Sequence, residues 1–268
     1  MNLRLHERRA MEIDLREALA AGQFSLAYQP QVCTVTVAGS HVITGAEALL
    51  RWAHPVKGNI PPDQFIPLAE QTNLILPIGE WVMRSACREA AAWPSKLSVA
   101  VNVSTVQFRS PGFVELVERI LQETGLPGDR LELEITESVM MTDTAEAVAV
   151  MERLRSLGIK LAMDDFGTGY SSLGYLRKFK FDKIKIDKSF IRHLGEQGES
   201  AAIVRAVVGM SRAMGVESNA EGVETEQQSA MLLGEGCTEM QGYLFGRPMT
   251  GAAFMNLVAE RPSWRPAA

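Results

Sequence analysis

The sequence contains little cysteine and no long apolar run, and these two shortages exclude whole classes of protein. Its 268 residues include three cysteines, Cys33, Cys87 and Cys237, which are too few and too widely spaced for a disulfide framework or a zinc site. No apolar run approaches the roughly 18 to 20 residues of a membrane-spanning helix, and no charged leader with an apolar core opens the chain. We therefore expect a cytoplasmic segment; whether the intact protein is tethered to a membrane stays open.

The chain also lacks an excess of positive charge. Its 27 Lys and Arg against 32 Asp and Glu give a formal net charge of -5, so we expect no binding to duplex nucleic acid. An acidic site can still hold a nucleotide through metal ions. With 46% hydrophobic and 22% charged residues, the composition is typical of a soluble globular protein with a sizeable core.

What the sequence does contain is an alternation of short β-rich runs and helical patterns, repeated about eight times, as in the barrel folds. This order predicts an α/β protein with a (β/α)8 TIM-like barrel, because each helix returns the chain to the start of the next parallel strand. A doubly wound open sheet is the alternative fold, but no Gly-rich dinucleotide fingerprint follows the first strand. The predicted strands cover residues 24–32, 45–52, 97–104, 131–137, 159–165, 182–187, 216–222 and 239–246.

The beginning of the chain departs from this regular scheme. The connection between residues 32 and 45 is too short for a helix, so the first two strands should form an antiparallel hairpin and give the barrel an irregular first strand. Before them, residues 8–23 have the pattern of an amphipathic helix that ends near Gly22. We interpret residues 1–22 as a linker helix from an upstream module and residues 23–268 as the barrel domain, with a native start at the helix as the alternative.

Alternation along the strands places polar side chains inside the barrel. Residues of equal parity share one face of a strand, and in the central strands the apolar face can pack on the surrounding helices. The inward face then carries Glu132 and Glu134 in one strand and Lys183 and Lys185 in another. Several polar residues come late in their strands, where barrel enzymes carry their chemistry.

A set of these late residues forms a candidate metal site. Like charges in a confined apolar space raise one another's pKa, so many inward carboxylates need a compensating cation. The set offers only oxygen ligands, which favour Mg²⁺ or Mn²⁺ over zinc, and adjacent aspartates suit two metal ions that share a carboxylate. The candidate ligands are Glu47, Asn102, Glu134, Asp164 and Asp165.

The stretch FGTGYSS after the two aspartates has the glycine freedom to fold over this site and to place hydroxyl donors from Thr168, Ser171 and Ser172. Taken singly, each feature has an ordinary explanation. Two aspartates before a glycine commonly form a solvated strand end or a helix cap, and an inward lysine commonly completes a structural ion pair. The convergence of acids from independent strands at one end of one cavity favours the metal site.

The ordered motifs of the chain resemble those of the EAL family of cyclic di-GMP phosphodiesterases. The Glu-Ala-Leu run that names the family stands at residues 47–49, within EALLRWAHP. The resemblance extends from about Ala18 to about Met249 and covers nearly the whole chain. It also includes YQP, GNIPPDQFIPLAE, VNVS, LEITES, DDFGTGYSSL, KIDKSF, AEGVET and QGYLFGRP.

The resemblance implies a role for each matching residue. The candidate ligands would bind two metal ions per site, Mg²⁺ or Mn²⁺, and Lys185 and Glu221 would act on the attacking water or the second metal. Among carboxylates Lys185 should stay protonated, so Glu221 is the better candidate for the general base. Glu137 resembles the acid that anchors the DDFGTG loop. The residues that resemble the family's substrate-binding set are Gln29, Arg51, Gln241 and Pro248.

The implied reaction is hydrolysis of one phosphodiester bond of cyclic di-GMP to linear pGpG. The resemblance also implies a homodimer formed beside the DDFGTG loop and an upstream GGDEF or sensory domain in the intact protein. One alternative is a catalytically silent domain that binds cyclic di-GMP as a sensor or serves as an interaction module. Another is an enolase-like barrel enzyme, which would need a capping domain for which this chain has no room.

Two features depart from the family pattern. Glu217, Ser218 and Asn219 stand where family members commonly carry aliphatic residues. By strand parity Asn219 points inward, beneath the metals, where it would alter the hydrogen bonding of the ligands. The first hairpin, QVCTVTVAGSHVITG, is longer than usual and lacks the acid often found where Cys33 stands.

Overall fold

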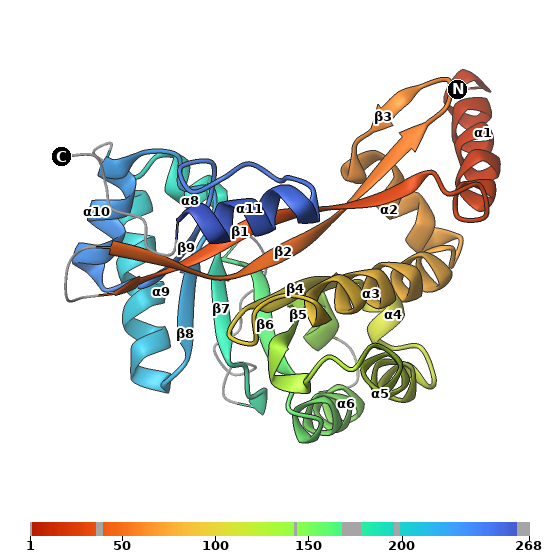
Figure 1. The fold of residues 1–268 in the computed structure, drawn as a ribbon. Helices are drawn as coiled ribbons and strands as arrows, with labels where there is room; N and C mark the ends of the chain where they lie inside the picture. Colours follow the sequence, from red (N-terminus) through yellow and green to blue (C-terminus); the bar gives the residue numbers. More distant parts are fainter. Residues whose placement is uncertain (1, 36–39, 142–143, 168–177, 196–198, 262–268) are drawn as a thin grey trace.

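The β-strands close into a barrel (Figure 1). This computed structural model describes residues 2–35, 40–141, 144–167, 178–195 and 199–261. Its strands are β1 (Phe24–Val35), β2 (Ser40–His54), β3 (Gly58–Ile60), β4 (Ser98–Val103), β5 (Leu131–Thr136), β6 (Lys160–Phe166), β7 (Lys183–Ile186), β8 (Glu217–Ala220) and β9 (Glu239–Gln241). The sheet order is β1-β9-β8-β7-β6-β5-β4-β2-β3, and the pairing of β1 with β2 completes the ring.

The first strand is the irregular part of the barrel. β1 runs antiparallel to both of its neighbours, β2 and β9, whereas the pairs from β2–β4 to β8–β9 are parallel. The predicted hairpin of the first two strands is thus confirmed, and so is the (β/α)8 barrel with an antiparallel first strand. Since the parallel strands all end at one rim, their late residues are brought together there.

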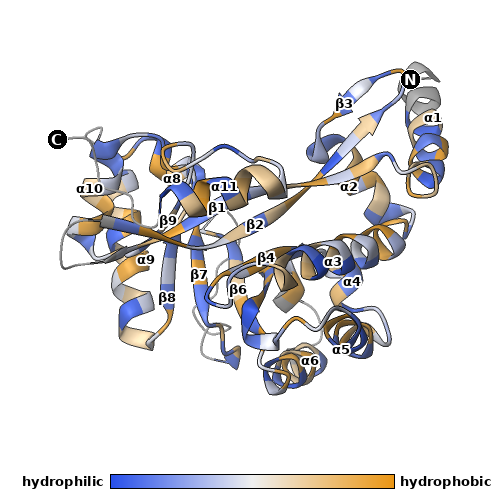
Figure 2. Cartoon of the chain, viewed as in Figure 1, coloured by the Kyte–Doolittle hydropathy of each residue, from blue (hydrophilic) through white to orange (hydrophobic). Residues whose placement is uncertain are grey.

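Most of the helices lie around the strands (Figure 1), and apolar residues run along both helices and strands (Figure 2). Pro77 lies in the first turn of the helix at Ile75–Ala91, where a proline is tolerated because its missing N–H would have no partner there. The last helix and several short ones were not predicted. The helices are α1 (Asn2–Ala18), α2 (Pro62–Gln71), α3 (Ile75–Ala91), α4 (Thr105–Phe108), α5 (Phe113–Thr124), α6 (Thr144–Ser156), α8 (Lys188–Arg192), α9 (Glu199–Met214), α10 (Glu226–Glu235) and α11 (Gly251–Glu260), with 3₁₀ turns η1 (Gly128–Arg130) and η2 (Glu137–Met141).

The amino-terminal helix is attached to an arm beside the barrel, formed by the far end of β2 with β3 and α2 (Figure 1). Leu15 and Ala18 of α1 are fully buried in the hydrophobic core. Asp14 accepts a hydrogen bond from Lys57 Nζ at 2.6 Å and lies 3.2 Å from His54 Nε2. The helix ends at Ala18, earlier than predicted, and Gly22 adopts a left-handed conformation in the turn that follows. Residues of α1 thus pack into the same hydrophobic core as the domain that was predicted to begin at residue 23.

A buried arginine holds the end of α3 against the barrel. Arg130 donates hydrogen bonds to Leu97 O at 2.8 Å, Ala90 O at 2.7 Å and Trp93 O at 3.4 Å. Replacing Arg130 with methionine leaves these carbonyls without their donor, and we expect a loss of about 3 kcal/mol in the free energy of unfolding. Urea unfolding measures the loss, and a change below about 1 kcal/mol would contradict it. The exposed Arg119, replaced by methionine, is the control and should change little.

His41 makes the stability of the hairpin depend on pH. Its Nδ1 lies 2.6 Å from Thr34 Oγ1, its Nε2 lies 3.4 Å from Ser229 Oγ, and burial lowers its pKa. The unfolded chain therefore binds a proton more readily than the folded chain, so stability should fall as the pH drops below the unfolded value of about 6.5. We expect the melting temperature to fall more steeply in the parent than in His41→Gln. Parallel curves for the two proteins would contradict this expectation.

Candidate active site

Acidic side chains from several strands surround one lysine at the carboxyl-terminal rim of the barrel. The Nζ atom of Lys185, on β7, lies 2.6 Å from Glu134 Oε2 and 2.6 Å from Glu221 Oε1. The same atom lies 3.2 Å from Asp164 Oδ1 and 3.9 Å from Glu47 Oε2. We call these five residues the acidic cluster. Residues from β2, β5, β6, β7 and the end of β8 thus meet at one point, as strand parity predicts.

Amide side chains hold the carboxylates of the cluster in place. Glu47 Oε1 accepts a hydrogen bond from Asn102 Nδ2 at 2.6 Å, and Glu47 Oε2 accepts one from Gln241 Nε2 at 2.5 Å. The amide nitrogen of Gln241 also donates to Gln29 Oε1 at 3.1 Å. Both oxygens of Glu47 are therefore fixed by neutral donors, which position the carboxylate without cancelling its charge.

Gln31 belongs to the same amide layer, although it was not predicted. Its Nε2 lies 3.5 Å from Glu134 Oε1 and 3.2 Å from Gln241 Oε1, and its side chain is buried. Gln31 stands two residues after Gln29 and so shares its face of β1. That parity was the available signal, but the contact with Glu134 depends on closure of the barrel across β1 and β9.

The two adjacent aspartates take different directions. The pairing of β6 with β7 shifts register between Met163 and Phe166, and Asp165 adopts a φ of 55°. This left-handed conformation is uncommon outside glycine, and such backbone strain is concentrated at functional sites. Asp164 therefore ends the inward face of the strand, while the exposed Asp165 turns with the chain that follows.

A close backbone contact joins the segments that carry Glu221 and Gln241. Val223 N donates to Gln241 O at 3.0 Å, and Leu244 N donates to Val223 O at 3.1 Å. A Cβ atom on Gly242 would collide with the backbone of Val223, so only glycine permits this approach. The contact shortens the predicted last strand, which ends at Gln241.

Glu137 contacts the segment after the aspartates. Its Oε1 accepts a hydrogen bond from Gly167 N at 3.2 Å. The η2 turn that begins at Glu137 is held in turn by Arg109, whose Nη2 lies 3.4 Å from Ser138 O and from Val139 O. The predicted lid donors Thr168, Ser171 and Ser172 lie outside the described residues.

The charges of the cluster do not balance. Burial, together with the nearby Glu47 carboxylate, raises the pKa of Glu134 well above its usual range. Burial opposes the charge of Lys185, but the carboxylates of Asp164 and its neighbours outweigh it and raise the pKa of Lys185. Burial raises the pKa of Glu221 to about 7, although Lys185 opposes the rise. The single ammonium of Lys185 therefore faces four carboxyl groups, more than one positive charge can neutralise.

This imbalance is the main reason that divalent cations fit the cluster. Among the described residues, no group of three or more Asp, Glu, His or Cys side chains is arranged to hold a metal ion. The ammonium of Lys185 lies at the centre of the carboxylates and draws them toward itself. Asp164 Oδ1 is buried and makes no hydrogen bond of good geometry with any described residue. An all-oxygen set with surplus negative charge suits hard divalent cations.

A pocket of about 290 Å³ lies against β2, α2 and α3; its lining is mostly apolar and also includes Arg51, Asn102 and Thr136. The half-buried Arg51 lines this pocket, and its guanidinium is of the kind that can clamp a phosphate. Gln29 Nε2 donates to Gly246 O at 3.3 Å and so contacts the segment that contains the half-buried Pro248. Of the predicted substrate-binding residues, Gln29 and Gln241 contact each other, and Gln241 also contacts Glu47 of the acidic cluster.

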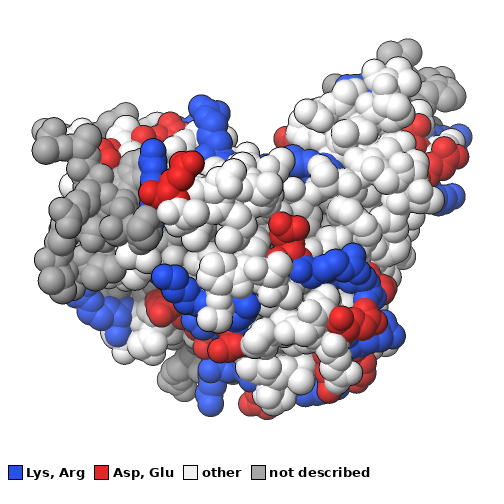
Figure 3. Space-filling model, viewed as in Figure 1, with Lys and Arg blue, Asp and Glu red and all other residues white. Residues whose placement is uncertain are grey.

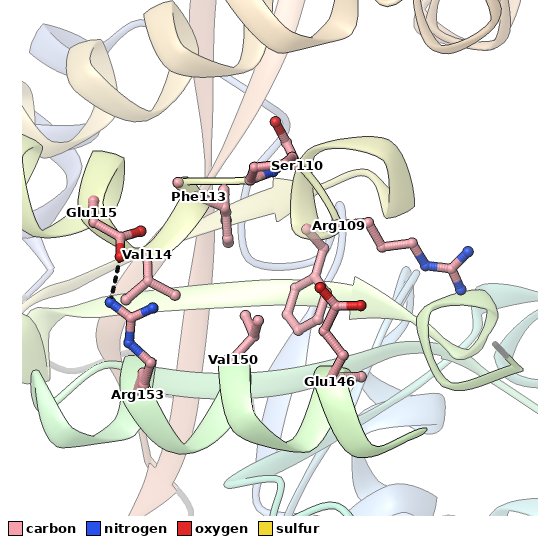
Figure 4. A pocket seen from close by; sticks show the side chains of 12 residues that line it. Arg109, Ser110, Phe113, Val114, Glu115, Glu146, Val150 and Arg153 are labelled. Atoms are coloured by element: carbon pink, nitrogen blue, oxygen red, sulfur yellow. Dashed lines mark hydrogen bonds and ion pairs between the residues drawn. The ribbon is translucent and has the colours of Figure 1, made fainter. Parts of the chain in front are cut away.

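A separate pocket of about 420 Å³ lies between α5 and α6 (Figure 4). Phe113 and Val150 form part of its lining, and the ion pair of Arg153 with Glu115, at 2.7 Å, crosses one side. None of the predicted site residues lines it. On the face drawn in Figure 3, basic and acidic side chains are mixed, without a broad surface of one sign among the residues coloured.

Comparison with known proteins agrees with the motifs. The model of the EAL domain family matches residues 12–248. The chain belongs to the EAL domain family. A solved structure described as the PaMucR phosphodiesterase in a c-di-GMP complex is similar to this EAL domain with a TM-score of 0.86 at 43% identity. The match covers 91% of this chain and 99% of that one.

Curated relatives of the EAL domain include two proteins of Pseudomonas aeruginosa. MucR, named as a bifunctional diguanylate cyclase/cyclic di-GMP phosphodiesterase, is 43% identical over 97% of this chain and 38% of its own length. NbdA, named as a cyclic di-GMP phosphodiesterase, is 40% identical over 91% of this chain and 31% of its own length. The chain thus spans about a third of the length of these relatives. None of the helices described here is long and apolar enough to cross a membrane.

Proposed function

We propose that this EAL domain is a metal-dependent phosphodiesterase that hydrolyses cyclic di-GMP to linear pGpG. The observation that carries the proposal is the convergence of four carboxylates on the Lys185 ammonium at the carboxyl-terminal rim of the barrel, those of Glu47, Glu134, Asp164 and Glu221. Relatives named for this activity, and the likeness to a phosphodiesterase in a c-di-GMP complex, support the choice of substrate.

The candidate ligands would hold two divalent cations, Mg²⁺ or Mn²⁺. When bound, these ions would lower the pKa of a shared water and stabilise charge on the attacking and leaving oxygens. They would be held by Glu47, Asn102, Glu134, Asp164 and Asp165.

The other residues of the site bind the nucleotide and handle the proton. Glu221 would take the proton from the attacking water, because its pKa lies near neutrality and the ammonium beside it is not a base. Lys185 would orient that water with its fixed positive charge. Arg51 would clamp a phosphate oxygen. The amides of Gln29 and Gln241, with Pro248, would line the nucleotide pocket.

The alternative is a domain that binds cyclic di-GMP without cutting it. Chromatography of the nucleotide after incubation with the purified domain and either Mg²⁺ or Mn²⁺ detects cleavage, and equilibrium dialysis measures binding. We expect pGpG to form in the first assay. Binding without pGpG would overturn the enzymatic proposal in favour of the sensor, and the intact acidic cluster is the observation that speaks against that outcome.

We further propose the surroundings in which the domain works. Residues 1–22 would join the barrel domain of residues 23–268 to an upstream GGDEF or sensory domain, since MucR is named for a cyclase activity as well. The domain would work in the cytoplasm, as a homodimer that contacts its partner next to the DDFGTG loop. Duplex nucleic acid would not be a partner, because the chain has a net charge of -5.

The hydrogen bond from Gly167 to Glu137 should contribute to catalysis by holding the chain after Asp165. Glu137→Ala removes the acceptor, and we expect the rate of hydrolysis to fall about tenfold. Glu137→Gln keeps an acceptor oxygen and should lose less. Steady-state rates and the mass in solution, from light scattering, measure activity and dimerisation together. Equal rates for the parent and Glu137→Ala would contradict the anchoring role.

A further inference from the structure

A second ionic cluster lies inside the barrel, one layer below the acidic cluster. Lys183 Nζ is 2.8 Å from Glu132 Oε2 and 2.8 Å from Glu239 Oε2. The ammonium and Glu132 are almost fully buried. This arrangement repeats that of the upper layer, because Lys185 reaches Glu134 on the same pair of strands, β7 and β5.

Asn219 stands between the two layers, and its side-chain amide makes no hydrogen bond with any described residue. It is aligned with Lys185 on β7 and with Glu239 on β9. The residue is 0% exposed, and among the described residues neither its Nδ2 nor its Oδ1 has a hydrogen-bond partner. A buried amide without partners is unfavourable, and an aliphatic side chain would avoid the cost. We therefore look for a role that only an amide, and not an aliphatic side chain, can fill at this position.

The bonds of Lys185 suggest what that function is. The Lys185 ammonium lies 2.6 Å from an oxygen of Glu134 and from one of Glu221, and it forms a longer ion pair, at 3.2 Å, with Asp164 Oδ1. Two of these carboxylates are proposed ligands of divalent cations, so the ammonium and the cations compete for the same oxygens. If Lys185 loses those oxygens, it needs another acceptor in the dry interior of the barrel. The unused acceptor on the neighbouring strand is Asn219 Oδ1.

We propose that Asn219 is a positioning residue that accepts a hydrogen bond from Lys185 when divalent cations take the carboxylates of Glu134 and Asp164. Its Nδ2 would then face Glu239, whose Oε2 also lacks a hydrogen bond of good geometry among the described residues. The exchange lowers the competition between ammonium and cation, and so raises the affinity for the cation. It also keeps the positive charge of Lys185 at the site. The inference rests on the proposed function only for the identity of the metal ligands.

A matched pair of variants tests the acceptor directly. Asn219→Val and Asn219→Thr have nearly the same shape, but the threonine hydroxyl can accept a hydrogen bond and valine cannot. We measure Mn²⁺ binding by titration calorimetry without nucleotide. The affinity should fall about tenfold in Asn219→Val, the lower end of what loss of a hydrogen-bond partner around a metal site costs, and less than about threefold in Asn219→Thr. Equal losses in the two variants would overturn the proposal.

The effect must also depend on the ammonium. In a Lys185→Met background no ammonium needs an acceptor, so Asn219→Val should change the Mn²⁺ affinity less than about twofold. A tenfold loss that persists in this background would show that Asn219 acts on the metal site by another route and would overturn the proposal. Thermal unfolding without metal should show Asn219→Val at least as stable as the parent. A large loss of stability would contradict the absence of partners in the metal-free protein.

These measurements use Mn²⁺ without nucleotide, so their outcome does not depend on whether the domain hydrolyses cyclic di-GMP. If the dependence on Lys185 is found but no pGpG forms, the proposed function fails and the role of Asn219 holds. If pGpG forms but the variants bind Mn²⁺ like the parent, the role of Asn219 fails alone. A parent protein without saturable Mn²⁺ binding overturns both.

Discussion

Replacing Glu47 with glutamine is expected to lower the rate of cyclic di-GMP hydrolysis by about a thousandfold or more. The change keeps the shape of the side chain but removes a charged oxygen ligand from the proposed metal site. Loss of about 4 kcal/mol of charge stabilisation corresponds to that factor. The amide would also place a donor against Asn102 or Gln241, both of which now donate to the carboxylate.

The control for Glu47→Gln is Glu115→Gln, on the exposed side of α5, which should leave the rate within about twofold because surface changes of this kind have small effects. Initial rates at saturating Mn²⁺ give the comparison, and thermal unfolding shows that both variants are folded. A fall of less than about tenfold for Glu47→Gln would remove Glu47 from the ligand set.

Glu221→Gln should reduce kcat by about a hundredfold to ten-thousandfold, the range for loss of a general base. Glu221 lies 2.6 Å from Lys185 Nζ and has a pKa raised to about 7, so it can accept a proton near neutral pH. The KM for cyclic di-GMP should change little, because the base acts on water and not on the nucleotide.

Glu224→Gln is the matched control for the base, since Glu224 is exposed and stands in the same AEGVET motif. Full kinetic curves of kcat and KM are needed for both variants. If Glu221→Gln keeps more than a tenth of the parent kcat, another group takes the proton and the assignment of the base is wrong.

The sequence predicted the inward-facing cluster because the strands alternate so regularly. Because side chains along a strand alternate between two faces, the orientation of one polar residue determines the orientation of all the others. This alternation alone predicted that Glu134 and Lys185 point into one cavity. The hairpin of the first two strands also followed from sequence, because the short connection excludes a helix.

Contacts that depend on closure of the ring could not be predicted. Gln31 meets Glu134 only when β1 completes the barrel, and Glu239 meets Lys183 only when β8 and β9 have paired in register beside β7. Local sequence patterns do not determine the register between strands that are far apart in the chain. The left-handed turn at Asp165 is a further example, since it arises from a register shift against β7.

Boundaries of elements were less predictable than their kind. The last predicted strand ends at Gln241, because Gly242 packs against Val223 and the chain turns there. The helix at Gly251–Glu260 was missed, although Thr250 accepts a hydrogen bond from Ala253 N and so caps its start. Both features depend on contacts and caps that the hydrophobic pattern alone does not show.

The measurement that tests the central claim most directly is hydrolysis in water labelled with ¹⁸O, followed by mass spectrometry of the product. If water held at the acidic cluster attacks phosphorus, pGpG should carry one ¹⁸O atom on its terminal phosphate, and only when Mg²⁺ or Mn²⁺ is present. Product formed equally well in a chelator, or product without the label, would contradict the account.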